Sequence, residues 1–238
     1  MTDEELLTVD GLSVSYGNIQ VIEDANATVS DGDIVSIVGA NGAGKTTLLK
    51  TISGVKQPMD GTIRYRGEDI TAAHPHQVIE RGITYVPERH RIFSEMTVHE
   101  NLVTASVAAR DRDRERAFER VFGLFPILRE RREQTAGTLS GGQQQMLAIS
   151  QGLIADPDVI MLDEPTLGLA PQIVDRIHET IISINEEGTT VIISDEQIEM
   201  PMAVSDRMYL MRENTLRYLG EAGEFESKYE EIRDETLE

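Results

Sequence analysis

Apolar and polar residues alternate over the first part of the chain, a period of two that predicts β-strands with one buried face. Residues 6–16, 21–29 and 62–65 follow this pattern. Turn-forming pairs such as Gly17-Asn18 and Asp60-Gly61 separate the segments. The first part of the chain is therefore predicted to form short strands joined by tight turns.

Three other segments are apolar almost without interruption, at residues 34–38, 159–162 and 190–193. Continuous runs of this length are typical of parallel strands that are covered on both faces. Stretches compatible with helices lie between these runs. Strands that alternate with helices in this way predict an α/β core.

The middle of the chain, residues 88–150, has a helical pattern. Thr97 is predicted to cap a helix that begins at residue 98, with Glu100 completing a capping box. Between residues 109 and 132, opposite charges alternate with apolar residues at helical spacing, which predicts a helix with one solvated face. The acidic tail after Gly220 is compatible with a peripheral helix.

The most specific motif follows the first apolar run. Residues 39–46 read G-x-x-x-x-G-K-T between a predicted strand and a predicted helix, which is the context of a phosphate-binding P-loop. Glycines let the backbone approach phosphates, Lys45 can reach the β- and γ-phosphates, and the Thr46 hydroxyl can ligate Mg²⁺. An ordinary glycine-rich turn is the simpler alternative, and the flanking strand and helix argue against it. The predicted nucleotide-binding residues here are Gly39, Asn41, Gly42, Ala43, Gly44, Lys45, Thr46 and Thr47.

Two adjacent carboxylates, Asp163 and Glu164, end the second apolar run. Asp163 is placed to hold Mg²⁺, and Glu164 can polarise an attacking water molecule. Adjacent acids are also common on protein surfaces, but a P-loop in the same chain favours the functional interpretation. We therefore predict that Lys45 and Glu164 are catalytic and that Thr46 and Asp163 bind the metal.

A second glycine-rich segment, Leu139-Ser140-Gly141-Gly142-Gln143, precedes a helix predicted over residues 144–154. Ser140 is a favourable N-cap, and the glycines allow another backbone or a ligand to come close. The segment is thus predicted to be a second anion-binding helix terminus. A capped helix that follows a glycine turn is the simpler alternative.

These three motifs in one chain resemble the ATP-binding-cassette (ABC) ATPases, and the resemblance covers nearly the whole chain. It implies one domain with a RecA-like P-loop NTPase core of α/β type, at about residues 1–87 and 151–238. It also implies an antiparallel β-subdomain and an inserted α-helical subdomain at about residues 88–150.

The same resemblance implies that two cassettes face each other head to tail with two ATP molecules between them. Ser140 and Gly142 would then contact the γ-phosphate held by the opposite protomer, within a binding segment that includes Gly141 and Gln143. Tyr16 matches the aromatic residue that stacks on adenine, although a lone Tyr before a turn can also be a plain strand-end residue.

Finer features, at residues 86–93, 144–149 and 167–171, resemble the ATPase subunits of branched-chain amino-acid importers. In the first segment Glu88 stands where most ABC ATPases have Gln, and the resemblance places it near the metal and the attacking water. This subfamily implies ATP and Mg²⁺ as cofactors, a second ATPase subunit that is a different chain, transmembrane permease subunits and a solute-binding protein outside the membrane. Urea or short-amide importers share the pattern; a soluble ABC ATPase without a transport role and a nucleotide-binding scaffold are further alternatives.

One position departs from the ABC pattern. Most ABC ATPases have a His that contacts the γ-phosphate after the strand predicted at 190–194, where this chain reads Asp195-Glu196-Gln197. Counting back from residues 205–207 selects Glu196, whereas the subfamily's E-Q pair selects Gln197. A Glu would repel the phosphates because both are negatively charged, so Gln197 is the better phosphate partner and is the third predicted catalytic residue. We expect slow hydrolysis at this site.

Composition restricts the class of protein further. The chain has 238 residues, a formal net charge of −20 and no cysteine, so it cannot form disulfides or thiolate metal sites. The charge disfavours nucleic acid as a partner and favours a halophilic protein in a high-salt cytoplasm, with a merely acidic mesophilic protein as the alternative. The acidic start and the lack of a long apolar run predict a protein that is made and kept in the cytosol. The resemblance implies that permease subunits hold it at the cytoplasmic face of the membrane. The histidines show no metal-ligand spacing.

Overall fold

The computed structural model describes residues 5–88, 92–108 and 114–225. Its first layer is an antiparallel sheet in the order β2-β1-β4-β5. The sheet confirms the strands predicted from the alternating pattern, and β1 and β2 extend a little further than expected. Its strands are β1 (Glu5–Tyr16), β2 (Ile19–Ser30), β4 (Asp60–Tyr65) and β5 (Glu68–Asp69).

The second layer is a sheet in the order β10-β9-β3-β8-β7-β6, in which only β10 runs antiparallel to its neighbour. Every residue of β3, β7 and β8 is buried, as predicted for strands covered on both faces. The strands are β3 (Ile34–Val38), β6 (Ile83–Val86), β7 (Val159–Asp163), β8 (Thr190–Asp195), β9 (Arg207–Arg212) and β10 (Thr215–Glu221).

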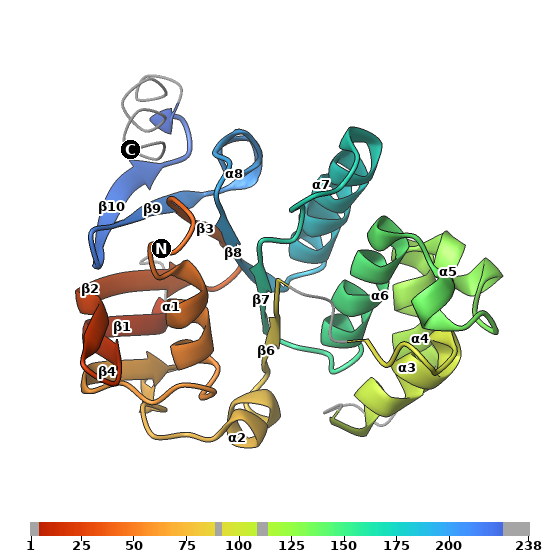
Figure 1. The fold of residues 1–238 in the computed structure, drawn as a ribbon, viewed down its shortest axis with the longest axis horizontal. Helices are drawn as coiled ribbons and strands as arrows, with labels where there is room; N and C mark the ends of the chain where they lie inside the picture. The colour runs from red at the N-terminus through yellow and green to blue at the C-terminus, as the bar shows by residue number, and fades with distance from the viewer. Residues whose placement is uncertain (1–4, 89–91, 109–113, 226–238) are drawn as a thin grey trace.

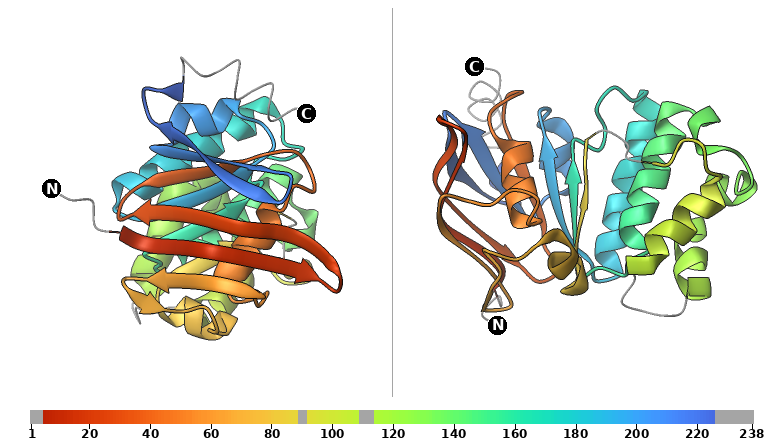
Figure 2. Two further views of the ribbon diagram at one scale, coloured as in Figure 1. Left: turned by 90° about the vertical axis from the view of Figure 1, so that its left-hand side faces the viewer. Right: turned by 60° about the horizontal axis from the view of Figure 1, so that its bottom comes forward.

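Helices cover both faces of this central sheet (Figure 1). Helix α1 (Lys45–Ile52) lies between the two sheets, with α2 (Pro75–Glu80) at the lower edge (Figure 2). Helices α6 (Gly141–Leu153) and α7 (Pro171–Glu186) cover the opposite face. Two large apolar clusters fill the spaces on either side of the sheet. The arrangement confirms the α/β P-loop fold.

Further helices pack on the outside of α6: α3 (Val98–Ala105), α4 (Arg114–Leu124) and α5 (Pro126–Glu130), with 3₁₀ turns at Ser106–Ala108 and Ala136–Thr138. Thr97 caps α3 in a capping box with Glu100, as predicted. The charged helix predicted up to residue 132 is interrupted at Phe125, because Pro126 has no N–H to continue the ladder.

Helix α6 starts three residues before the predicted position, directly after its N-cap Ser140. A short helix, α8 (Glu199–Val204), follows β8. Parts of three predicted segments lie outside the described residues: 89–91 of the segment 86–93, 109–113 of the charged helix, and 226–238 of the acidic tail. None of the described helices is long and apolar enough to cross a membrane.

Candidate nucleotide-binding site

The P-loop joins β3 to α1, and packing requires glycine at two of its positions. Gly39 has a φ of 155°, and a Cβ there would collide with the carbonyl oxygen of Met211 in β9. Gly44, the N-cap of α1, has a φ of 117°, and a Cβ would lie 3.1 Å from the carbonyl oxygen of Val21. Both conformations are strained for residues with a side chain. The fold itself therefore requires this loop shape.

The start of α1 presents backbone donors. Within the described chain, no acceptor takes the N–H groups of Gly44, Lys45, Thr46 or Thr47, and the first paired amide is that of Leu48, which bonds the Gly44 carbonyl at 2.9 Å. Free N–H groups at a helix start, together with the helix dipole, attract anions. This terminus can therefore bind phosphate through its backbone.

Lys45 is buried beneath the loop, with 3% of its side chain exposed. Its Nζ donates to the carbonyl oxygens of Gly39 at 2.7 Å and Ala40 at 3.1 Å. It also forms an ion pair with Glu164 Oε1 at 3.2 Å. Lys45 and Glu164, two of the three residues predicted to be catalytic, therefore lie together, although 119 positions separate them in the sequence. A phosphate at the loop would compete with Glu164 for the ammonium group.

Asp163, at the end of β7, is fully buried and accepts three hydrogen bonds. Its Oδ1 accepts from Thr46 Oγ1 at 3.0 Å and from Ser194 Oγ at 2.6 Å, and its Oδ2 accepts from the Tyr85 hydroxyl at 2.8 Å. The pair of Thr46 and Asp163 was predicted. Tyr85 and Ser194 were missed, and the only signal for Ser194 was a hydroxyl directly after an apolar run.

Glu164 has a φ of 48°, a left-handed conformation that is strained for a residue with a side chain. Its backbone N–H donates to the Ser194 carbonyl oxygen at 2.9 Å, which holds this turn beside the end of β8. Only 6% of the side chain is exposed. The strained turn therefore directs the carboxylate to Lys45.

The end of β8 lies directly beside the end of β7. Asp195 is buried there, and its Oδ1 accepts from the backbone N–H of Gln197 at 3.0 Å. Glu196 is half-buried and Gln197 is exposed. No hydrogen bond of either side chain within the described residues distinguishes the two as the phosphate partner, so Gln197 stays a prediction.

The metal-binding residues that we predicted are only partly brought together. Thr46 and Asp163 are in contact, and their hydroxyl and carboxylate oxygens are the ligands that Mg²⁺ prefers. Because Mg²⁺ usually takes few protein ligands and completes its shell with phosphate oxygens and water, this pair fits the ion. Glu88 follows β6 and is half-buried, and no hydrogen bond or ion pair within the described residues joins it to either ligand.

Tyr16 ends β1 and has 47% of its surface exposed, which leaves its ring open to a planar ligand. Lys56 Nζ lies 4.8 Å from the ring centroid, a cation–π contact that covers part of the ring. Sequence reasoning missed Lys56, since nothing in its neighbours marks it as close to Tyr16.

The Leu139–Gln143 motif lies apart from the P-loop. Ser140 caps α6, with the Gln143 N–H at 3.4 Å from its Oγ. Gly142 is needed for packing, because a Cβ there would lie 2.7 Å from Ile173 Cγ2 on α7, whereas Gly141 is exposed and open. Helices α1 and α6 lie on opposite faces of the central sheet in both views (Figures 1 and 2). One chain therefore does not bring the two glycine-rich segments into one site.

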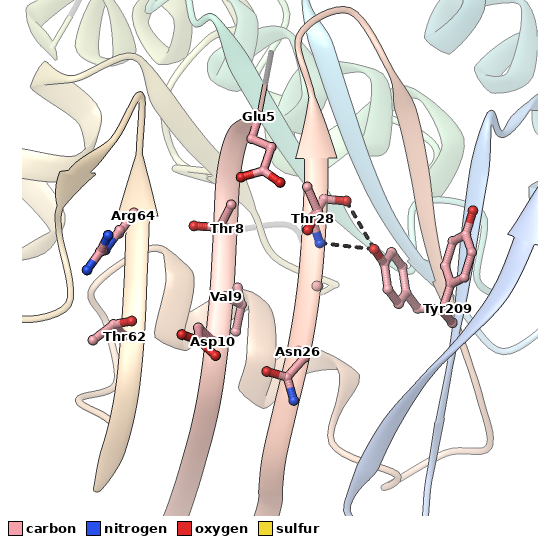
Figure 3. A pocket seen from close by; sticks show the side chains of 11 residues that line it. Glu5, Thr8, Val9, Asp10, Asn26, Thr28, Thr62, Arg64 and Tyr209 are labelled. Carbon is pink, nitrogen blue, oxygen red and sulfur yellow. Dashed lines mark hydrogen bonds between the residues drawn. The ribbon is translucent and has the colours of Figure 1, made fainter. Parts of the chain in front are cut away.

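A separate hollow of about 470 Å³ lies on the outer face of the antiparallel sheet (Figure 3). The Tyr209 hydroxyl on its wall accepts from the Thr28 N–H at 2.9 Å and donates to the Thr28 carbonyl oxygen at 3.1 Å. No residue predicted for nucleotide binding lines this hollow. It is therefore distinct from the P-loop site.

The two sheets, the P-loop and the acidic end of β7 define a nucleotide-binding cassette. The ABC transporter family model matches residues 22–167. The high-affinity branched-chain amino acid transport ATP-binding protein BraG of Pseudomonas aeruginosa is 42% identical over 206 residues, which cover 87% of this chain and 88% of that protein. The chain therefore belongs to the ABC transporter family, in agreement with its motifs.

Two further comparisons extend this result. The probable branched-chain amino acid transport ATP-binding protein LivF of Archaeoglobus fulgidus is 33% identical over 227 residues, or 93% of this chain and 95% of that protein. A solved nucleotide-free ATP-binding cassette from an ABC transporter has a TM-score of 0.85 and 24% identity over 98% of this chain and 96% of that chain. The structural match shows the same fold.

Proposed function

We propose that this chain is the ATP-hydrolysing subunit of an ABC importer that takes up branched-chain or related hydrophobic amino acids. Family membership supports the ATPase part, and the names of the relatives from P. aeruginosa and A. fulgidus support the solute class. The observation that carries the ATPase part is the convergence of Lys45, Glu164 and the Thr46–Asp163 pair at the free amides of α1.

In this proposal the P-loop binds the triphosphate of ATP. The free amides of residues 44–47 and the Lys45 ammonium neutralise the β- and γ-phosphates, within a segment that also includes Gly39, Asn41, Gly42 and Ala43. Tyr16 stacks on the adenine ring. Catalysis then depends on positioning and electrostatics, since phosphoryl transfer needs little covalent work from the protein.

Thr46 and Asp163 would hold Mg²⁺, with Glu88 beside them. The bound ion supplies charge neutralisation on the phosphate oxygens. Ser194 and Tyr85 orient Asp163 through the bonds at 2.6 and 2.8 Å. Partners of this kind around a ligand carboxylate fix its direction and raise metal affinity.

Glu164 orients and polarises the attacking water. Glu164 forms an ion pair with Lys45. When Lys45 binds the phosphates instead, the Glu164 carboxylate becomes free to accept a hydrogen bond from the attacking water. Gln197 is the proposed phosphate partner after β8. Because neither Glu196 nor Gln197 is a His, hydrolysis at this P-loop is slow and the second ATPase subunit carries more turnover.

The second cassette supplies its own Ser-Gly-Gly-Gln segment to this P-loop, while Ser140, Gly141, Gly142 and Gln143 reach the nucleotide of that partner. The separation of α1 from α6 supports this arrangement. By the subfamily resemblance the partner is a different chain, and both dock on permease subunits at the cytoplasmic face of the membrane. A solute-binding protein delivers the amino acid to the permease from the other side.

Uptake of labelled leucine, urea and acetamide by cells with and without this subunit tests the transport function. Loss of leucine uptake alone supports the proposal, and loss of urea or acetamide uptake assigns the chain to the related importers. Unchanged uptake of all three, with steady phosphate release by the purified protein, identifies an ABC ATPase without this transport role. Binding of ATP without phosphate release identifies a scaffold.

Glu→Gln substitutions made one subunit at a time test the asymmetry of turnover. Glu164→Gln should reduce uptake less than the matching substitution in the partner. Loss of all uptake from Glu164→Gln alone, with the partner variant unaffected, contradicts the slow-site hypothesis.

We also propose that the protein is adapted to high salt. Its net charge of −20 makes the folded chain repel itself, and dissolved ions screen this repulsion. The midpoint temperature of unfolding should therefore rise across a potassium chloride series, more than in sucrose of equal osmolality. Highest stability in dilute buffer rejects the adaptation.

A further inference from the structure

Asp195, the last residue of β8, has an unusual position for an acid. It is 5% exposed and ends a buried strand in which it is the one charged residue. Its carboxylate bonds two different loops: Oδ2 accepts from Thr166 Oγ1 at 3.2 Å, and Oδ1 accepts from the Gln197 N–H at 3.0 Å. Thr166 belongs to the loop after Glu164, and Gln197 to the turn after β8.

Burial of this carboxylate is unfavourable in itself. Loss of hydration raises the pKa of Asp195, and the negative charge of nearby Glu164 adds to the rise. An apolar residue would complete β8 without that penalty. What the acid supplies instead is its two acceptor oxygens, and both are used to join the loops that border the Lys45–Glu164 site.

These loops form the walls of a hollow of about 710 Å³, which Thr166, Leu169, Asp195 and Gln197 help to line. A side-chain oxygen that accepts from the amide two residues later makes an Asx turn, which fixes the backbone of that segment. The bond to Asp195 therefore sets the direction in which the exposed Gln197 side chain leaves the chain. The bond to Thr166 ties this turn to the strained turn at Glu164.

We propose that Asp195 is a positioning residue for ATP hydrolysis, which holds the Gln197 turn and the Glu164 loop in a fixed relation around the γ-phosphate. This inference rests on the proposed roles of Glu164 and Gln197. Misplacement of catalytic groups by about 1 Å can reduce turnover strongly without abolishing substrate binding.

The test uses the assembled complex with the partner ATPase subunit inactivated by its own Glu→Gln substitution, so that only this P-loop turns over. Asp195→Val should lower kcat about tenfold and change KM for ATP less than about twofold. Asp195→Asn should keep kcat within about threefold of the unchanged protein, because an amide can accept from Gln197 and donate to the Thr166 hydroxyl. In a Gln197→Ala background, Asp195→Val should cause a smaller further loss, because only the bond to the Thr166 loop then still matters for turnover.

Asp33→Val is the matched control, since Asp33 is a partly buried acid at the opposite end of the sheet that pairs with Arg207 at 3.3 Å. It should lower thermal stability and leave kcat unchanged. The inference is wrong if Asp195→Val keeps kcat within twofold, if Asp195→Asn loses as much as Asp195→Val, or if the loss is the same in both Gln197 backgrounds. Glu164→Gln distinguishes failure of this inference from failure of the proposed function. If Glu164→Gln is inactive and Asp195→Val has normal turnover, only the role of Asp195 is rejected. If Glu164→Gln is active, the proposed catalytic role of Glu164 is rejected.

Discussion

The two glycine-rich segments of this chain differ in how far the single molecule completes them. At the P-loop, Lys45 and Glu164 are buried and paired, and Asp163 is held by three hydrogen bonds. At the start of α6, Ser140 and Gly141 are exposed, and among the residues that the structure describes their contacts are limited to capping and packing of their own helix. The first segment is organised as a site by the chain itself. The second can act on nucleotide only when another molecule approaches.

The position of the segments on the central sheet explains this difference. The P-loop follows β3, whose parallel neighbour β8 also pairs with β7, so the carboxyl ends of three strands meet at one edge. Ligands bind at such edges in α/β proteins. Helix α6 covers the opposite face of the sheet from α1 (Figure 2). Substitutions at the P-loop should therefore already affect the isolated chain, whereas substitutions at the start of α6 should affect only the assembled pair.

The largest expected effect is on the P-loop. Lys45→Ala should weaken ATP binding by the isolated chain about 100-fold, because it removes a buried charge aimed at the phosphates. Equilibrium dialysis with labelled ATP measures this. Lys50→Ala, on the next turn of α1, is the control and should bind normally. Equal affinity of both variants for ATP would show that Lys45 does not contribute to nucleotide binding.

Ser140→Arg should separate the two segments. In the assembled complex it should lower ATP turnover about 30-fold, because a long side chain at the exposed N-cap blocks the approach of the opposite nucleotide. The ATP affinity of the isolated chain should not change. Glu186→Gln, at the far end of α7, makes the same one-unit change in net charge and controls for it. A weaker affinity in the isolated Ser140→Arg chain would contradict the separation.

Ser194→Ala should raise the Mg²⁺ concentration needed for half-maximal turnover about tenfold, since it removes the 2.6 Å bond that orients Asp163. A magnesium titration at saturating ATP checks this. Ser183→Ala on α7 removes a hydroxyl that donates to the Glu179 carbonyl oxygen within its own helix and should have no effect. An unshifted titration for Ser194→Ala would mean that Asp163 needs no such support.

The smallest effect is expected at Tyr16. Tyr16→Ala should weaken ATP binding about fivefold, whereas Tyr16→Phe should bind normally, because stacking needs the ring and not the hydroxyl. Inorganic triphosphate, which has no base, should bind both variants equally well. If Tyr16→Ala weakens triphosphate binding too, the residue supports the loop and not the base.

Much of the fold could be predicted from local sequence. The apolar runs at β3, β7 and β8, the capping box at Thr97, the N-cap at Ser140 and the P-loop spacing depend on neighbours within a few positions. Local pattern failed at two helix boundaries. It did not predict the interruption at Phe125, and it placed the start of α6 three residues too late. The residues that support Asp163 were missed, because Tyr85 and Ser194 lie 78 and 31 positions away in the sequence.

The sequence by itself determined the elements and the chemistry of the motifs, because strand periodicity, helix capping and the glycine–lysine spacing are short-range properties of the chain. Only the tertiary structure decided which groups meet. The parallel register of β7 with β8 sets Ser194 beside Asp163, and the turn after β7 brings Glu164 to Lys45. The tertiary structure also places Asp195 between the loop after Glu164 and the turn after β8. These contacts join residues distant in sequence, and pairing of the strands within the sheet together with packing of α1 against it creates them.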